Sequence, residues 1–286
     1  MNKSLTFAQY LALPATNWSK AKHMADSPKM YKFREANPIE DTPRFGMGRC
    51  AHTWLLEPHL MDHYAVFEGK VRRGAVWEEF EAVHLAKGHT ILTQAELEQS
   101  IAAAEAVKND EVAGPLFRAD DGDAEAVVMW THPATGIRCK GRVDYASEST
   151  RRLIDLKTAR SAHPRRFGMQ AADLMYHCQI VWYGDGVNHW RVEQGLAPVD
   201  WRHTLVAVEI EPPHQVGVFS LTEDQVAIAR ERIEQIMARI AECERLGKWP
   251  GRLTAEQALE LPRWEYNDDM EAGDVEVEVT EIEEAA

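Results

Sequence analysis

The feature of this chain that most constrains its fold is a group of three strand-like segments in the middle of the sequence. They cover residues 125–132, 137–146 and 152–158, and they follow one another closely. Residues 133–136, Pro-Ala-Thr-Gly, have the composition of a turn between the first two segments. We therefore expect a meander of neighbouring strands in the middle of the chain.

Helical patterns lie on both sides of these strands, and two more strand-like segments follow. The expected helices cover residues 45–57, 94–109 and 174–183, and the later strands cover residues 204–210 and 216–221. A long amphipathic helix begins after Thr222, where Thr-Glu-Asp-Gln forms a capping box. This order predicts an α/β or α+β fold with a central mixed sheet flanked by helices, in one domain over residues 1–264.

The charge of the chain is concentrated at its end. The net charge is −14, but residues 265–286 hold ten acidic and no basic residues. Without them the first 264 residues carry 36 acidic and 32 basic side chains, a net charge of −4. The body is therefore neutral enough to bind DNA, and we expect residues 265–286 to be a disordered acidic tail, with a regulatory DNA mimic as the alternative.

Cysteine spacing and hydropathy restrict the compartment and the metal classes. The four cysteines stand far apart and form no C-x-x-C pair, so the sequence supports neither a zinc ribbon, a thioredoxin-like redox centre nor an iron–sulfur cluster. No apolar run approaches the roughly 18 residues that cross a bilayer, and residues 1–20 lack a signal-peptide pattern. We expect a cytoplasmic protein with reduced thiols.

The second strand-like segment carries an unusual set of charges. Side chains alternate along a strand, so Ile137, Cys139, Gly141, Val143 and Tyr145 should share one face. The other face should then carry three cations and a carboxylate, namely Arg138, Lys140, Arg142 and Asp144. This pattern predicts the wall of a cleft that contacts a polyanion and holds a metal.

The next strand adds a carboxylate and an amine, because Asp155 and Lys157 should point to one side and Ile154 and Leu156 to the other. If the two strands are neighbours, Asp155 and Asp144 converge. Two close carboxylates repel each other unless a cation lies between them, and Mg²⁺ or Mn²⁺ is the natural occupant. The alternatives are an exposed ion pair on an edge strand for Asp155 and Lys157, and a strand-end turn residue for Asp144.

His52 is the remaining candidate ligand, and it lies on the expected helix with Gly48 one turn earlier. Glycine allows the helix to approach a neighbour closely, which would aim His52 inward. A neutral imidazole would share an ion with Asp144 and Asp155, and metal affinity would then weaken below about pH 6.5. The alternative is a core histidine beside Trp54, Leu55 and Leu56.

Four motifs occur along the chain in order: G-x-x-x-H (48–52), G-x-x-D (141–144), D-x-K (155–157) and Q-x-x-x-Y (179–183). Together they resemble the RecB-like branch of the PD-(D/E)xK nuclease superfamily, which has a restriction-endonuclease-like core. The segments SPKMY (27–31), CKGRVD (139–144), LIDLKT (153–158) and KWPG (248–251) narrow the match. They look like the nuclease domain of prophage exodeoxyribonuclease VIII (RecE), and the resemblance covers residues 4–265.

The resemblance implies a role for each matching residue. The metal ligands would be His52, Asp144, Asp155 and the backbone carbonyl of Leu156. Lys157 would orient or activate the attacking water. Gln179 and Tyr183 would line the site from one helix face, and Glu125 would be an additional acidic residue, with a solvated strand end as its alternative.

The implied activity is a Mg²⁺-dependent exodeoxyribonuclease, with Mn²⁺ as a substitute. It would digest double-stranded DNA ends 5′→3′ and leave 3′ single strands for a RecT-type annealing protein, as a ring-shaped homo-oligomer. Two alternatives remain. One is a nuclease of the same superfamily tied to a helicase or to CRISPR adaptation, and the other is a catalytically idle DNA-binding or interaction protein of the same fold.

Overall fold

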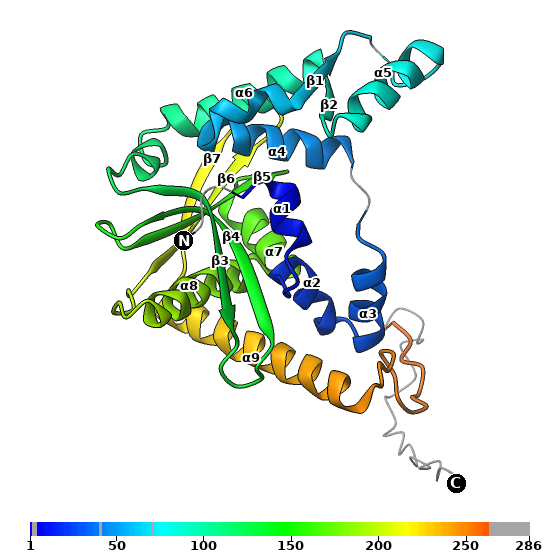
Figure 1. Cartoon of the computed structure of the whole chain (residues 1–286), viewed down its shortest axis with the longest axis vertical. Helices are drawn as coiled ribbons and strands as arrows, with labels where there is room; N and C mark the ends of the chain where they lie inside the picture. Colours follow the sequence, from blue (N-terminus) through cyan, green and yellow to red (C-terminus); the bar gives the residue numbers. More distant parts are fainter. Residues whose placement is uncertain (2–4, 40–41, 70, 263–286) are drawn as a thin grey trace, which may run out of the picture.

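The computed structural model describes residue 1 and residues 5–39, 42–69 and 71–262. Within these ranges the chain forms a five-stranded sheet of order β3-β4-β5-β6-β7 and a separate parallel pair, β1-β2. Helices flank the larger sheet, as Figure 1 shows. The expectation of a mixed sheet flanked by helices is confirmed, whereas the expected acidic tail at residues 265–286 lies outside the described residues.

The elements have the following bounds. The α-helices are α1 (Phe7–Ala12), α2 (Trp18–Ala21), α3 (Pro28–Ala36), α4 (Pro43–Leu56), α5 (Ala75–Ala86), α6 (Gln94–Asn109), α7 (Pro164–Asp173), α8 (Tyr176–Glu193) and α9 (Glu223–Leu246). The strands are β1 (Tyr64–Phe67), β2 (Thr90–Thr93), β3 (Asp123–Thr131), β4 (Arg138–Ser147), β5 (Arg152–Ala159), β6 (Arg202–Glu209) and β7 (Val216–Ser220). The five strands expected from the sequence are all present, with small shifts at their ends.

The larger sheet is antiparallel except at one place. β3, β4 and β5 form an antiparallel meander, and β6 and β7 form a second antiparallel pair. β5 and β6 run parallel, because α7 and α8 carry the chain across between them. The sheet is therefore mixed, and its central strand β5 has a partner on each side.

Two apolar cores hold the layers together. On one face of the sheet, Leu153 and Leu205 pack with residues of α8 and α9. On the other face, Ile154 and Leu156 pack with residues of α4 and α6. Neighbouring residues of β5 thus belong to different cores, as the expected alternation of Ile154 and Leu156 against Asp155 and Lys157 requires.

The alternation expected for residues 137–146 does not hold to the end of the strand. Val143 belongs to the α8–α9 core but Tyr145, two residues later, belongs to the α4–α6 core. The change coincides with Glu125 on the neighbouring strand, whose backbone adopts a left-handed φ of 50°. Glu125 and Asp144 lie opposite each other, between the paired residues Ala124–Tyr145 and Ala126–Val143, but they are not themselves paired. A local distortion of the sheet therefore lies at these two residues.

The expected helices are present, and their first residues differ from the expected ones by at most two positions. α6 has the bounds predicted for residues 94–109, and Thr222 and Gln225 form the predicted capping box of α9. The helix expected over residues 174–183 is longer and runs to Glu193, and Met175, at a left-handed φ of 56°, separates it from α7. Among the described helices, none combines the length and hydropathy needed to cross a membrane.

Candidate metal centre

His52 reaches the sheet from α4, which packs closely against β5. A Cβ atom at Gly48 would lie 3.0 Å from Thr158 Oγ1, so a larger residue at this position would require the Thr158 side chain or the helix to move. His52 lies one turn after Gly48 on the same helix face. The expected role of Gly48 in a close approach is therefore observed.

Three acidic residues occupy one row across the sheet. The pairing of β3 with β4 places Glu125 opposite Asp144, and the pairing of β4 with β5, extended by one residue, places Asp144 opposite Asp155. The left-handed backbone at Glu125 costs of order 1–3 kcal/mol, and such strain is concentrated at functional sites.

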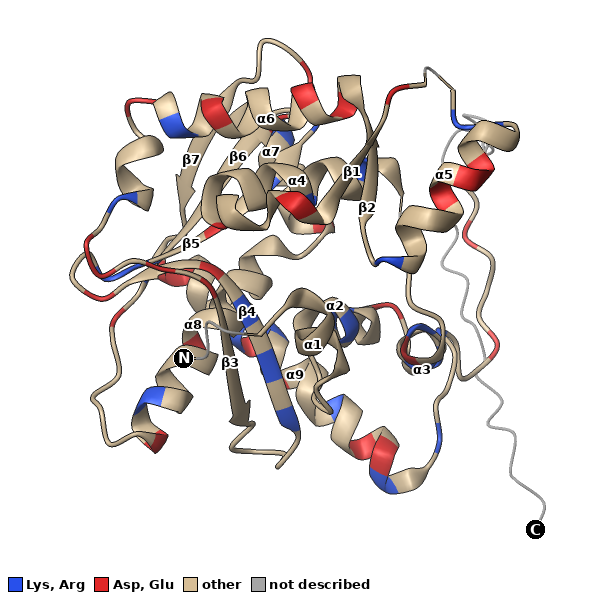
Figure 2. Cartoon of the chain, turned by 45° about the horizontal axis from the view of Figure 1, so that its top comes forward, with Lys and Arg blue, Asp and Glu red and all other residues tan. Residues whose placement is uncertain are grey.

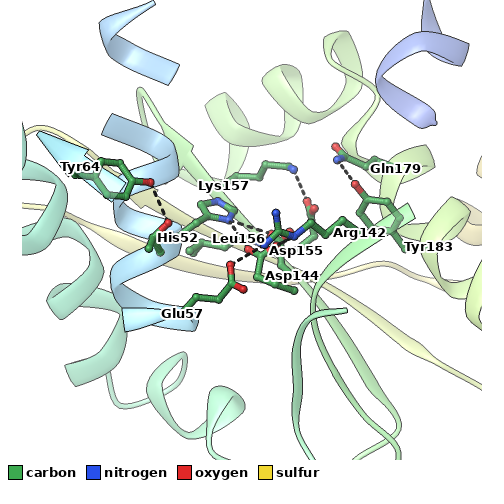
Figure 3. Close-up of polar contacts among 12 residues, drawn as sticks. His52, Glu57, Tyr64, Arg142, Asp144, Asp155, Leu156, Lys157, Gln179 and Tyr183 are labelled. Carbon is green, nitrogen blue, oxygen red and sulfur yellow. Dashed lines mark hydrogen bonds and ion pairs between the residues drawn. The ribbon is translucent and has the colours of Figure 1, made fainter. Parts of the chain in front are cut away.

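The carboxylates of Glu125 and Asp144 converge on the imidazole of His52. His52 Nδ1 lies 3.6 Å from Asp144 Oδ2 and 3.8 Å from Glu125 Oε1. One ligand atom from each of the three residues lies within 4.8 Å of the other two. Figure 3 shows His52 and Asp144 directed toward each other. His52 is thus a member of a candidate metal-binding group and not an isolated core histidine.

Asp155 lies beside this group, and its carboxylate is directed to Lys157 (Figure 3). Its side chain is only 1% exposed, and its Oδ2 lies 2.7 Å from Lys157 Nζ. Its Oδ1 is buried and accepts no hydrogen bond from the described residues. A buried carboxylate oxygen without a donor is costly, and a bound cation would remove that cost.

Comparison with known proteins places this arrangement in a family. Residues 17–260 match the family described as PDDEXK-like domain of unknown function (DUF3799). The chain belongs to this family. None of the curated proteins matches it. The superfamily expected from the four sequence motifs is therefore confirmed.

A solved structure supports the PDDEXK-like fold. The fold is similar to that of a proposed exonuclease from Eubacterium rectale, with a TM-score of 0.61 and 15% sequence identity. The match covers 91% of this chain and 96% of the other. At this level of identity the likeness establishes the fold alone.

Burial and neighbouring charges change the protonation of the PDDEXK-like site. Burial, together with the nearby carboxylates of Asp155 and Glu125, raises the pKa of Asp144 to about 7. Burial acts to lower the pKa of His52, but Asp144 and Glu125 outweigh it and raise that pKa above its usual value. Burial likewise opposes the charge of Lys157, whereas Asp155 and Asp144 raise its pKa. A metal ion, which needs a neutral imidazole and an ionised carboxylate, would therefore compete with protons at His52 and Asp144.

The donor set fits a hard divalent cation. Glu125 and Asp144 supply carboxylate oxygens, His52 supplies a ring nitrogen, and Asp155 adds an oxygen that no described donor satisfies. Mg²⁺ and Mn²⁺ prefer such oxygen-rich sites. Leu156 contributes through its backbone N–H, which donates to Asp144 Oδ2 at 2.8 Å and orients that carboxylate. Ligation by the carbonyl of Leu156 stays a prediction.

Arg142 and Glu57 belong to the site; the sequence predicted Arg142 as a contact to a polyanion and gave Glu57 no role. Arg142 Nε lies 2.7 Å from Glu125 Oε2. Its terminal nitrogen lies 2.6 Å from Glu57 Oε2, a contact drawn in Figure 3. Glu57 directly follows the helix that carries His52. Arg142 is thus engaged in orienting Glu125, which leaves Glu125 Oε1 directed to His52.

The expected row of DNA-contacting cations on β4 requires a correction. Figure 2 shows the basic residues as bands along the strand, but they have different surroundings. Lys140 is 1% exposed, and its ammonium donates three hydrogen bonds to the carbonyls of Tyr10, Leu11 and Leu13. An ammonium group has three donors, so none is left for a phosphate. Of the three cations only Arg138 is exposed. Arg142 is half-buried and is paired with the carboxylates of Glu57 and Glu125.

Gln179 and Tyr183 lie together on α8, as their spacing predicts. Gln179 Nε2 donates to the Tyr183 hydroxyl at 2.8 Å. A Cβ atom at Gly141 would lie 2.8 Å from Tyr183 Cδ1, so the glycine of the G-x-x-D motif provides the space for this ring. Tyr176, at the start of α8, places its ring 4.7 Å from Lys157 Nζ. This cation–π contact stabilises the charged ammonium of Lys157. No sequence motif indicated the contact.

Proposed function

We propose that this protein is a Mg²⁺-dependent nuclease that hydrolyses phosphodiester bonds of double-stranded DNA. The observation that carries the proposal is the row of Glu125, Asp144 and Asp155 beside His52, with Lys157 in contact with Asp155. Membership of the PDDEXK-like family and the fold shared with a proposed exonuclease support it.

The residues divide the chemistry between them. His52, Glu125, Asp144 and Asp155 would hold one or more divalent ions, which supply Lewis acidity and lower the pKa of bound water. Lys157 has a raised pKa and carries a proton at neutral pH. It would therefore act as a cation that orients the attacking water and offsets charge on the phosphate, and not as the base that deprotonates this water.

The finer assignment rests on the resemblance to exodeoxyribonuclease VIII. On this basis the enzyme degrades duplex ends 5′→3′ and leaves 3′ single strands for a RecT-type annealing protein, as a ring-shaped homo-oligomer. The intact set of ligands together with Lys157 favours an active enzyme over a catalytically idle relative.

Strand-specific labelling tests the proposal. Linear duplexes labelled at the 5′ or the 3′ end are incubated with Mg²⁺, with Mn²⁺ or with a chelator, beside a covalently closed circle of the same sequence. We expect divalent-ion-dependent release of the 5′ label and no attack on the closed circle. Cutting of the circle would assign an endonuclease, and an inert linear duplex would support the idle alternative.

A further inference from the structure

A basic segment begins at the metal centre and continues away from it. Residues 156–172 contain no acidic side chain, although the chain as a whole carries a net charge of −14. The segment holds Lys157, Arg160, Arg165 and Arg166, with His163 between them. It runs from β5, through the loop that follows, into the first turn of α7. We call Arg160, His163, Arg165 and Arg166 the basic segment.

The four side chains of the basic segment are exposed and free to bind an anion. Within the described ranges, no ion pair joins any of them to a carboxylate. Other arginines are engaged, for example Arg191 with Glu148 and Arg230 with Asp185. His163, Arg165 and Arg166 line a cavity of about 400 Å³. Its lining residues include two arginines and no carboxylate, which favours an anion such as a phosphate group.

The stability of α7 does not account for these arginines. Positive side chains in the first turn of a helix are unfavourable, because the amino end of the helix carries partial positive charge. α9 follows the usual pattern, with Glu223 and Asp224 in its first turn, whereas α7 has Arg165 and Arg166 there and no acidic residue. The arginines of α7 thus lie where folding alone would disfavour them.

Two ring contacts connect the basic segment to the metal centre. Phe167, which follows Arg166, places its ring 6.3 Å from the ring of Tyr176. That ring in turn lies 4.7 Å from Lys157 Nζ. Arg160 comes three residues after Lys157, which corresponds to about 10 Å of extended chain. This length is close to the rise of about three base pairs along the axis of a DNA duplex.

We propose that the basic segment binds the phosphates of the DNA strand a few nucleotides from the bond that is cut. The contact is to the backbone and is independent of base sequence. This inference rests on the proposed nuclease function and names the surface that holds its substrate. It replaces β4, where Lys140 is saturated by carbonyls, as the main source of cationic contacts.

Binding of a fluorescent blunt duplex, measured with a chelator so that no cleavage occurs, tests the inference. The double variant Arg165→Ala/Arg166→Ala should weaken binding about tenfold at 0.1 M salt and reduce the slope of log affinity against log salt by nearly 2, because each phosphate contact contributes about 0.9. Its melting temperature should stay unchanged or rise slightly, since cations leave the first turn of α7.

Arg232→Ala/Arg239→Ala is the matched control. These exposed arginines of α9 line a cavity that also contains Glu231, so the charge change is identical but the surroundings are less basic. The control should change affinity less than twofold. The inference is overturned if both double variants weaken DNA binding equally, or if the salt slope of Arg165→Ala/Arg166→Ala is unchanged. In that case the proposed nuclease function still stands, provided that the wild-type protein cleaves DNA. Conversely, if the wild-type protein binds DNA and the double variant lowers its salt slope as expected, but no cleavage occurs, only the proposed nuclease function is refuted.

Discussion

Asp155 and His203 are buried on neighbouring strands of the same sheet. Among the described residues, neither Asp155 Oδ1 nor His203 Nε2 has a hydrogen-bond partner. Their surroundings differ. Asp155 lies beside Lys157 and opposite Asp144, whereas the ring of His203 is packed under α8, where a Cβ atom at Gly184 would lie 2.5 Å from its Nε2. An unpartnered buried polar atom thus indicates chemistry where candidate metal ligands surround it, and it is a cost to stability where they do not.

The largest effect is expected for Asp155→Ala, which should lower Mg²⁺-dependent cleavage of duplex DNA by at least about 10³-fold, because several kcal/mol of metal-derived stabilisation are lost. The chain should stay folded with a lowered melting temperature, since Lys157 loses its carboxylate partner. His203→Gln is the control and should cleave DNA at the wild-type rate. If the two variants lose activity equally, the distinction between the two buried groups is wrong.

Lys157→Ala should separate binding of the ion from chemistry. We expect cleavage at saturating metal to fall by about 10²–10⁴-fold, because the positive charge near the water and phosphate is lost. Metal affinity, measured by calorimetry, should not fall, because the amine is not a ligand. A collapse of metal affinity with normal cleavage at saturation would make Lys157 a part of the ion site instead.

His203 should govern stability at acid pH. Burial lowers its pKa from the usual 6.5 to about 4 in the folded protein. Between these values the unfolded chain binds a proton that the folded chain does not, so the free energy of unfolding falls as the pH decreases from about 6.5 to 4. The total loss is roughly 3 kcal/mol. Urea titrations of His203→Gln should show a correspondingly flatter acid limb, and parallel curves for the two chains would contradict this.

The smallest effect concerns Arg142, which tests convergence at the metal centre. Arg142→Gln should weaken Mg²⁺ binding by about tenfold, because Glu125 loses the partner that orients it. Arg142→Lys, which keeps the positive charge, should recover part of this loss. Calorimetric titration of both variants measures the effect. An unchanged affinity in Arg142→Gln would mean that the sheet positions Glu125 without help.

The sequence predicted the site residues on regular strands and helices better than it predicted contacts between distant segments. The order of the strands, the inward direction of Asp155 and Lys157 and the pairing of Gln179 with Tyr183 all follow from periodicity. The parity of β4 failed at Tyr145, directly after the point where the pairing of β3 and β4 is interrupted at Glu125 and Asp144.

Contacts between distant segments were not predictable. Lys140 was expected to face a polyanion, yet its ammonium is bound by three carbonyls that lie about 130 residues away in the chain, those of Tyr10, Leu11 and Leu13. The pair β1-β2 was missed because each strand has only four residues. Each is stabilised by pairing with the other, which lies on the far side of α5 in the sequence. Short elements and tertiary hydrogen bonds carry no periodic signal.

α4 carries His52, ends beside Glu57 and also holds the outer layer of the molecule. Trp54 Nε1 donates to Glu105 of α6 at 2.7 Å, and Thr53 Oγ1 lies 2.9 Å from the Tyr64 hydroxyl of β1. A small displacement of this one helix would therefore move a ligand and the partner of Arg142 together. Substitutions in α6 or β1 are therefore expected to shift these two groups, so related chains with identical candidate ligands should differ in their affinity for an ion.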